Sequence, residues 1–338
     1  MASRITITGG AGFIGSTLAL AFAQAGHSVH SIDWVDDTGR TPQDRYPEPW
    51  LQRLRMERMA RLRQGGVTHH VMDIGQPGQL FEHLQTTQPA AVIHLAAQAG
   101  VRHSIQAPMD FVWPNLQGFA QVLDACHRLS IPRLLYASSS SVYGARHGAP
   151  FIETDRTDQP RSFYAATKMA NEAMAMAYDS QYGLKSIGMR FFTVYGPWGR
   201  PDMAPFLFAQ NLRRRQPVRL FAEGQLLRDF TFVNDTVAAV MGLCQLNPWI
   251  EHSTVVNVGH NTPIKIIDFV SQLADRLGVT AQLEMAPMQT ADVPLTCADE
   301  QRLLSLLKSW PHTALPDGID QFVRWLDSWD PLTPTPNT

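Results

Sequence analysis

Cysteine is scarce in this 338-residue sequence, which contains Cys126, Cys244 and Cys297. An odd number of widely separated cysteines indicates neither a disulfide framework nor a metal site, and it is typical of a reducing compartment. No stretch has eighteen uninterrupted apolar residues, and the chain enters a strand-like segment at Arg4 without a signal-peptide pattern. We therefore expect a cytoplasmic protein with no metal site and no membrane partner.

The sequence also lacks an excess of charge of either sign, because 30 acidic residues nearly balance 28 lysines and arginines. This balance argues against a nucleic-acid partner, and the arginines at 213–215 are interpreted as a solvated helix end. Charged residues make up 17% and hydrophobic residues 44% of the chain, as is typical of a globular enzyme. There is no internal repeat, and the Pro-Thr tail at 331–338 is expected to be frayed.

Three regularly spaced glycines, Gly9, Gly12 and Gly15, follow a β-branched segment at 4–8 and precede a helix predicted over 16–25. A strand, a tight glycine turn and a helix let the backbone approach a pyrophosphate, while the helix N-terminus faces the anion. The candidate cofactor contacts of this turn are Gly9, Gly12, Phe13, Ile14 and Gly15.

A second predicted strand at 29–33 ends in Asp33. Its carboxylate can accept hydrogen bonds from an adenosine ribose and would repel a 2′-phosphate, which predicts NAD rather than NADP as the cofactor. Later strand ends should meet Asp33 at one edge of a parallel sheet. The residues expected there, around the adenine and its ribose, are Asp73, Ile74, Leu95, Ala96 and Ala97. His94 is interpreted as a packed strand residue.

Strands and helices alternate through the first part of the chain, which predicts a Rossmann-type doubly wound parallel sheet. After the glycine turn we expect strands at 67–72, 91–95, 133–138 and 185–190, and helices at 49–63, 109–129 and 162–182. We assign residues 1–192 to an NAD-binding domain, to which part of 229–260 returns.

Beyond residue 192 the elements become shorter and prolines more frequent, which predicts a smaller mixed α/β substrate lobe over 193–330. Residues 193–202 are interpreted as a loop. The other expected elements are helices at 204–214, 234–246, 265–277, 299–308 and 316–328, and strands near 218–221, 229–232 and 254–258.

Tyr164 and Lys168 lie four residues apart in the helix predicted at 162–182, so both side chains should lie on one helix face. A cation close to a phenol favours the phenolate and lowers the tyrosine pKa. The pair is therefore a candidate proton shuttle, although the same spacing also occurs in helices with a surface tyrosine and a solvated lysine.

Taken together, these residues resemble the extended short-chain dehydrogenase/reductase family, which comprises sugar-nucleotide epimerases and dehydratases. The other segments that carry the resemblance are 100–104, 138–144, 190–202 and 228–231. Residues 190–203 are similar to the UDP-glucuronate 4-epimerases in particular. The resemblance implies an NAD-dependent isomerase that converts UDP-glucuronate to UDP-galacturonate through a transient 4-keto sugar.

The same resemblance implies roles for individual residues. Tyr164 is the catalytic acid and base, Lys168 holds the nicotinamide ribose and lowers the tyrosine pKa, and Ser139 hydrogen-bonds the reacting 4-hydroxyl. Asn115 belongs with the cofactor contacts. The implied substrate contacts are Ser139, Ser140, Ser141, Thr193, Arg200 and Arg228. Gln289 stands where many members have a phosphate-binding arginine, and it offers only a neutral donor.

Ser140 and Ser141 distinguish epimerisation from the other reactions of this family. Dehydratases and UDP-glucuronate decarboxylases of this family place acidic side chains beside the catalytic serine or threonine, whereas this chain has Ser140 and Ser141. Epimerisation is therefore preferred, with decarboxylation, another UDP-sugar 4-epimerase and a non-catalytic NAD-binding regulatory protein as alternatives. By family habit we expect a homodimer that pairs the helices at 109–129 and 162–182.

Overall fold

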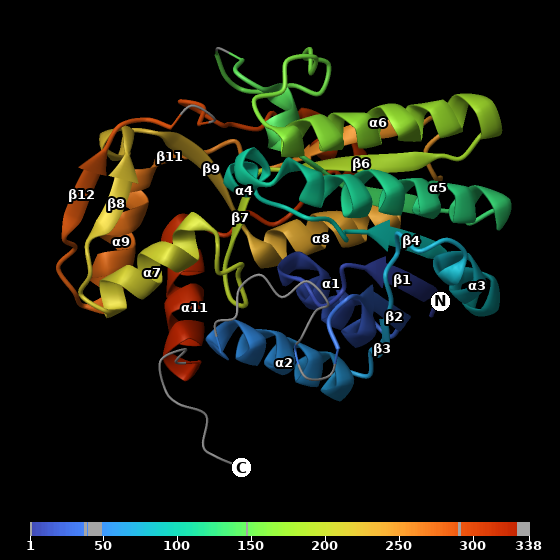
Figure 1. The fold of residues 1–338 in the computed structure, drawn as a ribbon, viewed down its shortest axis with the longest axis horizontal. Helices are drawn as coiled ribbons and strands as arrows, with labels where there is room; N and C mark the ends of the chain where they lie inside the picture. Colours follow the sequence, from blue (N-terminus) through green and yellow to red (C-terminus); the bar gives the residue numbers. More distant parts are fainter. Residues whose placement is uncertain (1, 37–38, 40–48, 147, 290–291, 330–338) are drawn as a thin grey trace.

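A seven-stranded parallel sheet forms the centre of the computed structural model, which describes residues 2–36, 39, 49–146, 148–289 and 292–329 (Figure 1). The strands are β1 (Arg4–Thr8), β2 (Ser28–Asp33), β3 (Thr68–Val71), β4 (Ala91–His94), β5 (Leu134–Ser139), β6 (Ser186–Phe191) and β10 (Thr254–Val258). Their spatial order is β10-β6-β5-β4-β1-β2-β3. The chain reverses its direction across the sheet between β1 and β4, and such a switch point opens a ligand crevice at the carboxyl ends of the strands.

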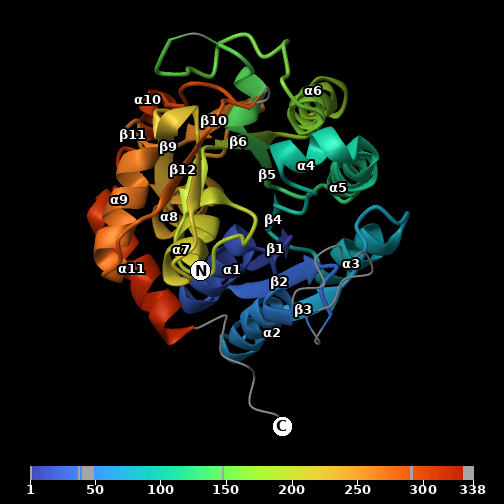
Figure 2. The ribbon, with the colours of Figure 1, turned by 60° about the vertical axis from the view of Figure 1, so that its left-hand side comes forward.

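Helices cover both faces of this sheet (Figure 2). Residues of α1 (Phe13–Gln24), α2 (Pro49–Gln64), α8 (Val233–Cys244) and α10 (Gln301–Leu307) share one apolar cluster with the sheet. Residues of α3 (Gln79–Thr87), α5 (Gly118–Arg128) and α6 (Phe163–Tyr182) contribute to a second cluster. Neighbouring strand residues alternate between the clusters, since Leu135 belongs to the first and Leu134 to the second. The predicted doubly wound α/β fold is confirmed.

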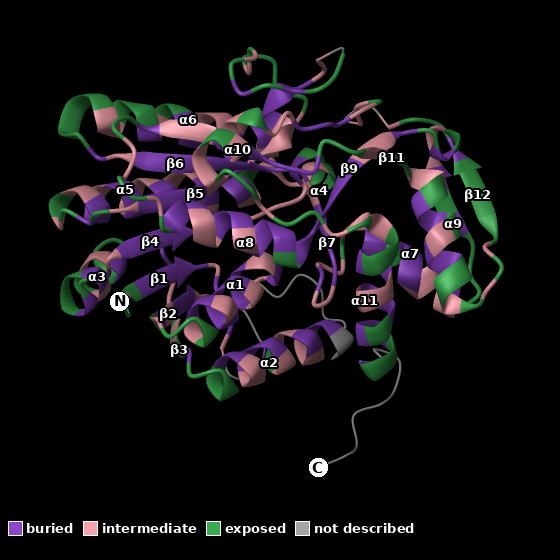
Figure 3. Ribbon diagram, turned by 180° about the vertical axis from the view of Figure 1, so that it is seen from behind, coloured by how far each residue is buried: buried purple, intermediate pink, exposed green. Residues whose placement is uncertain are grey.

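A smaller set of elements packs beside the end of the sheet and encloses a third apolar cluster (Figures 1 and 3). Its strands are β7 (Thr193–Tyr195), β9 (Leu227–Phe232) and β11 (Pro263–Lys265) in one sheet and β8 (Val218–Phe221) and β12 (Leu283–Ala286) in another. Its helices are α7 (Ala204–Arg213), α9 (Ile266–Leu277) and α11 (Leu315–Ser328). The expected mixed α/β composition of this part is confirmed, but the prediction that 193–195 is a loop is wrong, because these residues pair with β9.

The predicted continuous helix at 109–129 is also wrong in its first half. A 3₁₀ turn (Pro108–Phe111) and a π-helical segment (Val112–Gln117) precede α5. Pro114 has no backbone N–H and cannot make the regular helical hydrogen bond, so the chain cannot follow an unbroken α-helix there. Four further helical segments were not predicted: α3, α4 (Val101–Gln106) and the 3₁₀ turns at Ser140–Tyr143 and Ala222–Gly224.

The structure does not test two other expectations, the frayed tail and the cytoplasmic compartment. The tail at 331–338 lies outside them, so its predicted fraying stays a prediction. Within the described part of the chain, no helix is both long and apolar enough to cross a membrane. The expected compartment stays a prediction.

Candidate active site

The glycine turn lies at the carboxyl end of β1 and has almost no room for side chains. Gly9 has a φ of +72°, and a Cβ atom there would stand 2.6 Å from the backbone nitrogen of Ala96 at the end of β4. A Cβ atom on Gly15 would stand 2.1 Å from the carbonyl oxygen of Gly9. The glycines therefore let the turn fold tightly and bring the first turn of α1 close to the ends of the central strands.

The N-terminus of α1 is suited to an anion. No side chain caps it and its first turn contains no acidic residue, so N–H groups of this turn remain for a ligand. Gly12 precedes the helix, and Phe13 and Ile14 begin it. At the neighbouring strand end, Asp33 accepts hydrogen bonds from the backbone N–H groups of Ala11 at 3.0 Å and Trp34 at 2.7 Å. A pyrophosphate on the helix and a ribose on this carboxylate fit the residues present.

The residues expected around adenine lie at the carboxyl ends of β3 and β4. Asp73 accepts hydrogen bonds from the backbone N–H of Gly75 at 2.9 Å and from the Trp113 indole at 3.1 Å. Ile74 is buried. Leu95, Ala96 and Ala97 follow β4 directly and are half-buried.

His94 lies inside the sheet, and its Nδ1 is 2.7 Å from the hydroxyl of Thr8. Burial, together with the charge of Lys168, lowers the His94 pKa to about 3. This histidine is therefore neutral and packed, as predicted.

Asn115, predicted to contact the cofactor, is buried, and its side chain is fully used within the protein. Its amide accepts from the Gln98 N–H at 2.8 Å and donates to the Gln98 carbonyl and the Thr167 hydroxyl, both at 3.0 Å. These bonds join the segment after β4 to α6. Asn115 therefore positions the segment after β4 against the helix that carries Tyr164, and its direct contact with the cofactor stays a prediction.

The predicted helix that carries Tyr164 and Lys168 is confirmed as α6, and the hydroxyl of Ser162 caps it by accepting from the Ala165 N–H at 3.1 Å. Tyr164 lies in the first turn. Burial raises the pKa of Tyr164, while a hydrogen bond with Ser139 and the positive charge of Arg200 act in the opposite direction. Lys168 is not among the causes of this shift, and its expected effect on the Tyr164 pKa stays a prediction.

Lys168 is 2% exposed, and its ammonium group donates to the carbonyl oxygen of Ala137 at 2.8 Å. Burial lowers its pKa to about 8, although the carboxylate of Glu172 favours the charged form. Sequence reasoning missed Glu172, which lies one helical turn beyond Lys168 in the buried part of α6. The spacing of four residues was the available signal.

Glu172 is itself held by a buried ion pair with Arg190 on β6. The two atoms of the guanidinium, Nε and Nη2, bind the carboxylate at 2.9 and 2.7 Å. The hydroxyl of Ser138 donates to the same carboxylate at 2.5 Å. This network joins β5, β6 and α6 one helical turn beyond Lys168, so it positions the helix relative to the sheet.

The serines predicted to contact the substrate lie where β5 runs into its 3₁₀ turn. Ser141 donates to the hydroxyl oxygen of Ser139 from its own hydroxyl at 2.9 Å and from its backbone N–H at 3.2 Å. Ser140 begins the 3₁₀ turn, whose first residues include no carboxylate. Ser139 thus stands between Ser141 and the Tyr164 phenol.

Arg200 and Thr193 come from the smaller set of elements. Arg200 donates to the carbonyl of Ala99 at 3.3 Å and to the carboxylate of Asp202. Because the charge of Arg200 also acts on Tyr164, the guanidinium lies near the Tyr164 and Ser139 pair. Thr193 begins β7 and is half-buried.

Arg228 lies in a separate cationic cluster. Its guanidinium lies 3.8 Å from Asp292, and the guanidinium of Arg102 approaches the same carboxylate at 3.6 Å. Arg102 also lies over the ring of Phe221, 4.6 Å from its centre. Sequence reasoning missed Arg102, although it belongs to the segment 100–104 used for the family resemblance. Gln289 lies within the described residues, and whether it replaces the phosphate-binding arginine of other family members stays open.

Known proteins resemble this chain in both sequence and fold. Residues 5–259 match the profile of the "NAD dependent epimerase/dehydratase family". The chain belongs to this family. Its expected class, an NAD-dependent sugar-nucleotide epimerase, is confirmed, and the NAD cofactor predicted from Asp33 and the glycine turn is confirmed with it.

Individual relatives are similar over almost the whole chain. The probable UDP-glucuronate 4-epimerase of Rhizobium meliloti is 36% identical over 96% of this chain and 97% of its own length. UDP-glucuronate 4-epimerase 2 of Arabidopsis thaliana is 37% identical over 95% of this chain and 75% of its own. The crystal structure of UDP-glucuronic acid 4-epimerase from Bacillus cereus, in complex with UDP-glucuronic acid and NAD, has a TM-score of 0.86 at 28% identity, covering 96% of this chain and 99% of the other.

Proposed function

We propose that this protein inverts carbon 4 of UDP-glucuronate, giving UDP-galacturonate through a transient 4-keto sugar. NAD supplies the hydride acceptor and donor for this carbon. Tyr164 takes the proton of the 4-hydroxyl and later returns it, so one group serves as base and acid. Ser139, whose hydroxyl acts to lower the pKa of Tyr164, holds the reacting oxygen.

The observation that carries this proposal is that hydroxyl groups, and no carboxylate, follow Ser139 in its turn. Ser140 and Ser141 follow it in a turn without a carboxylate, and Ser141 is bonded back to Ser139. Elimination or decarboxylation would call for a further charged or proton-transferring group beside the reacting oxygen. With hydroxyls alone, the ketone is formed, turns its other face and is reduced.

We assign the substrate carboxylate to Arg200, with Thr193 beside it. A guanidinium binds a carboxylate in a bidentate manner, and Arg200 lies close enough to Tyr164 for its charge to lower the tyrosine pKa. In the protein alone, Asp202 already pairs with Arg200. The substrate carboxylate would therefore compete with Asp202 for the guanidinium. Arg228, with Arg102, is the proposed partner of the UDP phosphates, and the lobe at 193–330 is the proposed substrate lobe.

Incubation of the purified protein with UDP-glucuronate, followed by separation of the products, tests the reaction. UDP-galacturonate supports the proposal, whereas UDP-xylose with release of CO₂ supports decarboxylation. Retained NAD without turnover of UDP-glucuronate, UDP-glucose or an N-acetylated UDP-sugar supports a regulatory protein. Turnover of UDP-glucose alone would leave the epimerase mechanism in place and overturn the role of Arg200.

Replacement of Tyr164 by phenylalanine tests the proton shuttle. Product formation should fall by about 10²-fold or more, the usual contribution of a general acid and base, while NAD stays bound. Tyr182→Phe is a matched control, because Tyr182 lies at the other end of the same helix and is 52% exposed. Activity of Tyr164→Phe near that of the control would refute the role of Tyr164.

We also propose that two copies pair through α5 and α6. The support is an exposed apolar surface on α6, where Met176 is 50% and Tyr182 is 52% exposed. Light scattering after size-exclusion chromatography should give the mass of a dimer for the full chain and of a monomer for Met176→Lys. Met288→Lys, at an exposed methionine outside this helix, should remain dimeric.

A further inference from the structure

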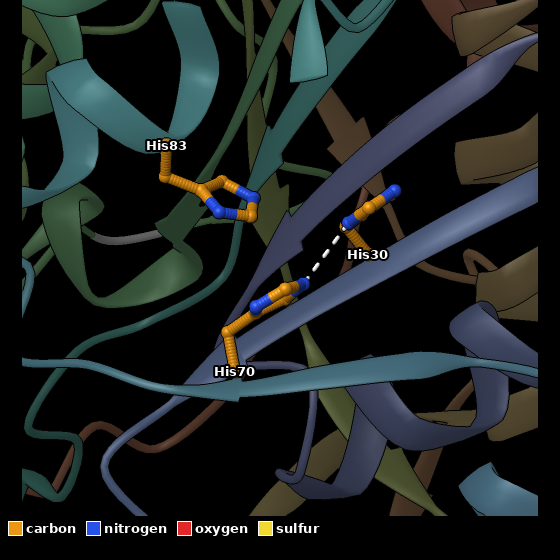
Figure 4. A group of neighbouring side chains, drawn as sticks. All are labelled: His30, His70 and His83. Carbon is orange, nitrogen blue, oxygen red and sulfur yellow. Dashed lines mark hydrogen bonds between the residues drawn. The ribbon is translucent and has the colours of Figure 1, made fainter. Parts of the chain in front are cut away.

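Three histidines from different elements gather at the edge of the large sheet, away from Tyr164. His30 is on β2, His70 on β3 and His83 on α3 (Figure 4). The Nδ1 atom of His30 is 3.0 Å from Nε2 of His70. One ring nitrogen of each histidine lies within 4.8 Å of the other two. Among the described residues, no other group of three or more histidine, cysteine, aspartate or glutamate side chains brings its ligand atoms this close together.

The bonding of these rings leaves capacity for a ligand. Nε2 of His83 is buried without a hydrogen-bond partner among the described residues, which is costly for a polar atom. His69, the neighbour of His70, differs in this respect, because its nitrogens lie 3.0 Å from the Ser31 hydroxyl and 3.0 Å from the Val35 carbonyl. Both ring nitrogens of His69 therefore have partners within the protein, whereas Nε2 of His83 has none among the described residues.

The protonation states suit a metal. Burial lowers the pKa of His30, His70 and His83, to about 4 for His83, and each ring is further disfavoured as a cation by its neighbours. The imidazoles are thus neutral at pH 7, which is the form that binds metal ions. The positive charge of Arg4 also lowers the pKa of His30, and the same charge would repel a metal ion bound to this ring. We therefore expect this site to bind more weakly than one flanked by carboxylates.

We propose that His30, His70 and His83 form a binding site for a divalent transition-metal ion of the zinc class, with a water molecule in the fourth position. Three imidazoles without a carboxylate favour Zn²⁺, Cu²⁺ or Ni²⁺ over Mg²⁺ or Ca²⁺. With metal–nitrogen bonds of about 2.0 Å, two ligands of a tetrahedral ion stand about 3.3 Å apart. The pair His30 and His70 already has a similar spacing, and His83 has to approach by a small rotation of its ring.

The ion would join β2, β3 and α3. His70 and His83 flank the segment that contains Asp73 and Ile74, the residues expected around adenine. An ion bound between the two histidines should restrict this segment. The proposed role is therefore a structural clamp at the adenine side of the sheet, rather than a part in the chemistry at Tyr164.

Metal titration of the full chain tests the site. The purified protein is treated with EDTA, desalted, and titrated with Zn²⁺ by calorimetry and with Co²⁺ by visible absorption. We expect one Zn²⁺ per chain, an intense Co²⁺ spectrum typical of tetrahedral coordination, and a higher melting temperature with Zn²⁺ than with Mg²⁺. In His83→Ala the Zn²⁺ affinity should fall by at least 10-fold and the intense Co²⁺ bands should disappear.

His252→Ala is the matched control, because this histidine is exposed and lies far along the chain from the three ligands. It should bind Zn²⁺ like the unaltered protein. If His83→Ala does not fold, His30→Gln provides the same test from β2. Equal Zn²⁺ affinity of the unaltered protein and both ligand variants would overturn the proposal, as would the absence of one-to-one binding in the unaltered protein.

Discussion

Replacement of Lys168 by methionine should make the protein more stable while it abolishes activity. Lys168 is 2% exposed, and its pKa falls from 10.5 to about 8. Since one pKa unit corresponds to about 1.4 kcal/mol, keeping this buried lysine charged costs about 3 kcal/mol of folding free energy at pH 7. Methionine has a similar length and no charge. It loses the hydrogen bond to Ala137, which is worth about 1 kcal/mol, so the expected net gain is about 2 kcal/mol.

The extra stability of Lys168→Met over the unaltered protein should decrease as the pH rises. The folded-state pKa of Lys168 lies below the unfolded value, so between pH 8 and 10.5 the unfolded chain binds more protons than the folded chain. The stability of the unaltered protein therefore rises relative to that of the variant over this window. The advantage of Lys168→Met should be fully present below pH 8, and the charge contribution should fall below about 1 kcal/mol at pH 10.

Thermal unfolding of the protein freed of NAD measures this effect. A gain of 2 kcal/mol corresponds to a rise of roughly 3 °C in melting temperature for a chain of this size. NAD has to be removed because a ligand that Lys168 helps to bind would stabilise the unaltered protein and mask the difference. Lys265→Met, at an exposed lysine, is the control and should change the melting temperature little. A melting temperature of Lys168→Met at or below that of the unaltered protein at pH 7 would refute the reasoning.

Three further substitutions test the network around the site. Gly15→Ala should reduce the amount of NAD that copurifies, measured by absorbance after denaturation, because its Cβ would stand 2.1 Å from the Gly9 carbonyl oxygen; unchanged NAD content would show that the turn can relax. Arg190→Met should lower the free energy of unfolding by about 3–5 kcal/mol in denaturant titrations, since it leaves the buried carboxylate of Glu172 without its cation; a loss below 1 kcal/mol would contradict this. Ser139→Ala should lower kcat by roughly 10- to 100-fold with NAD retained, because a hydrogen bond to the reacting oxygen is lost; an equal kcat would remove Ser139 from the mechanism.

Local sequence signals were sufficient to predict the NAD cofactor and the fold of the unit that is expected to hold it. The glycine turn and Asp33 depend on a strand, a turn and a helix that are consecutive in the chain, so their spacing can be recognised directly. The helix that carries Tyr164 and Lys168 is equally local. Prediction was poorer at 109–129, where hydrophobic periodicity continued across Pro114 although the backbone could not remain a regular α-helix there.

The electrostatic state of the site could not be predicted from spacing alone. Two side chains four residues apart share a helix face, but burial and partners from other elements decide which groups they contact and how their pKa values shift. Lys168 is turned to the carbonyl of Ala137, and burial raises the pKa of Tyr164. Likewise Arg190, from β6, reaches Glu172 only because the sheet brings β6 beneath α6.

The sequence by itself determined the doubly wound fold and the NAD cofactor, because both depend on short-range backbone geometry or on motifs of consecutive residues. The roles of Tyr164, Lys168 and Ser139 are predictions from the same motifs. Only the tertiary structure decided how those groups are charged and held. It also brought together His30, His70 and His83, which belong to three separate elements. Strand pairing and helix packing set the distances between these three side chains. A pattern of residues along the chain gives no information about those distances.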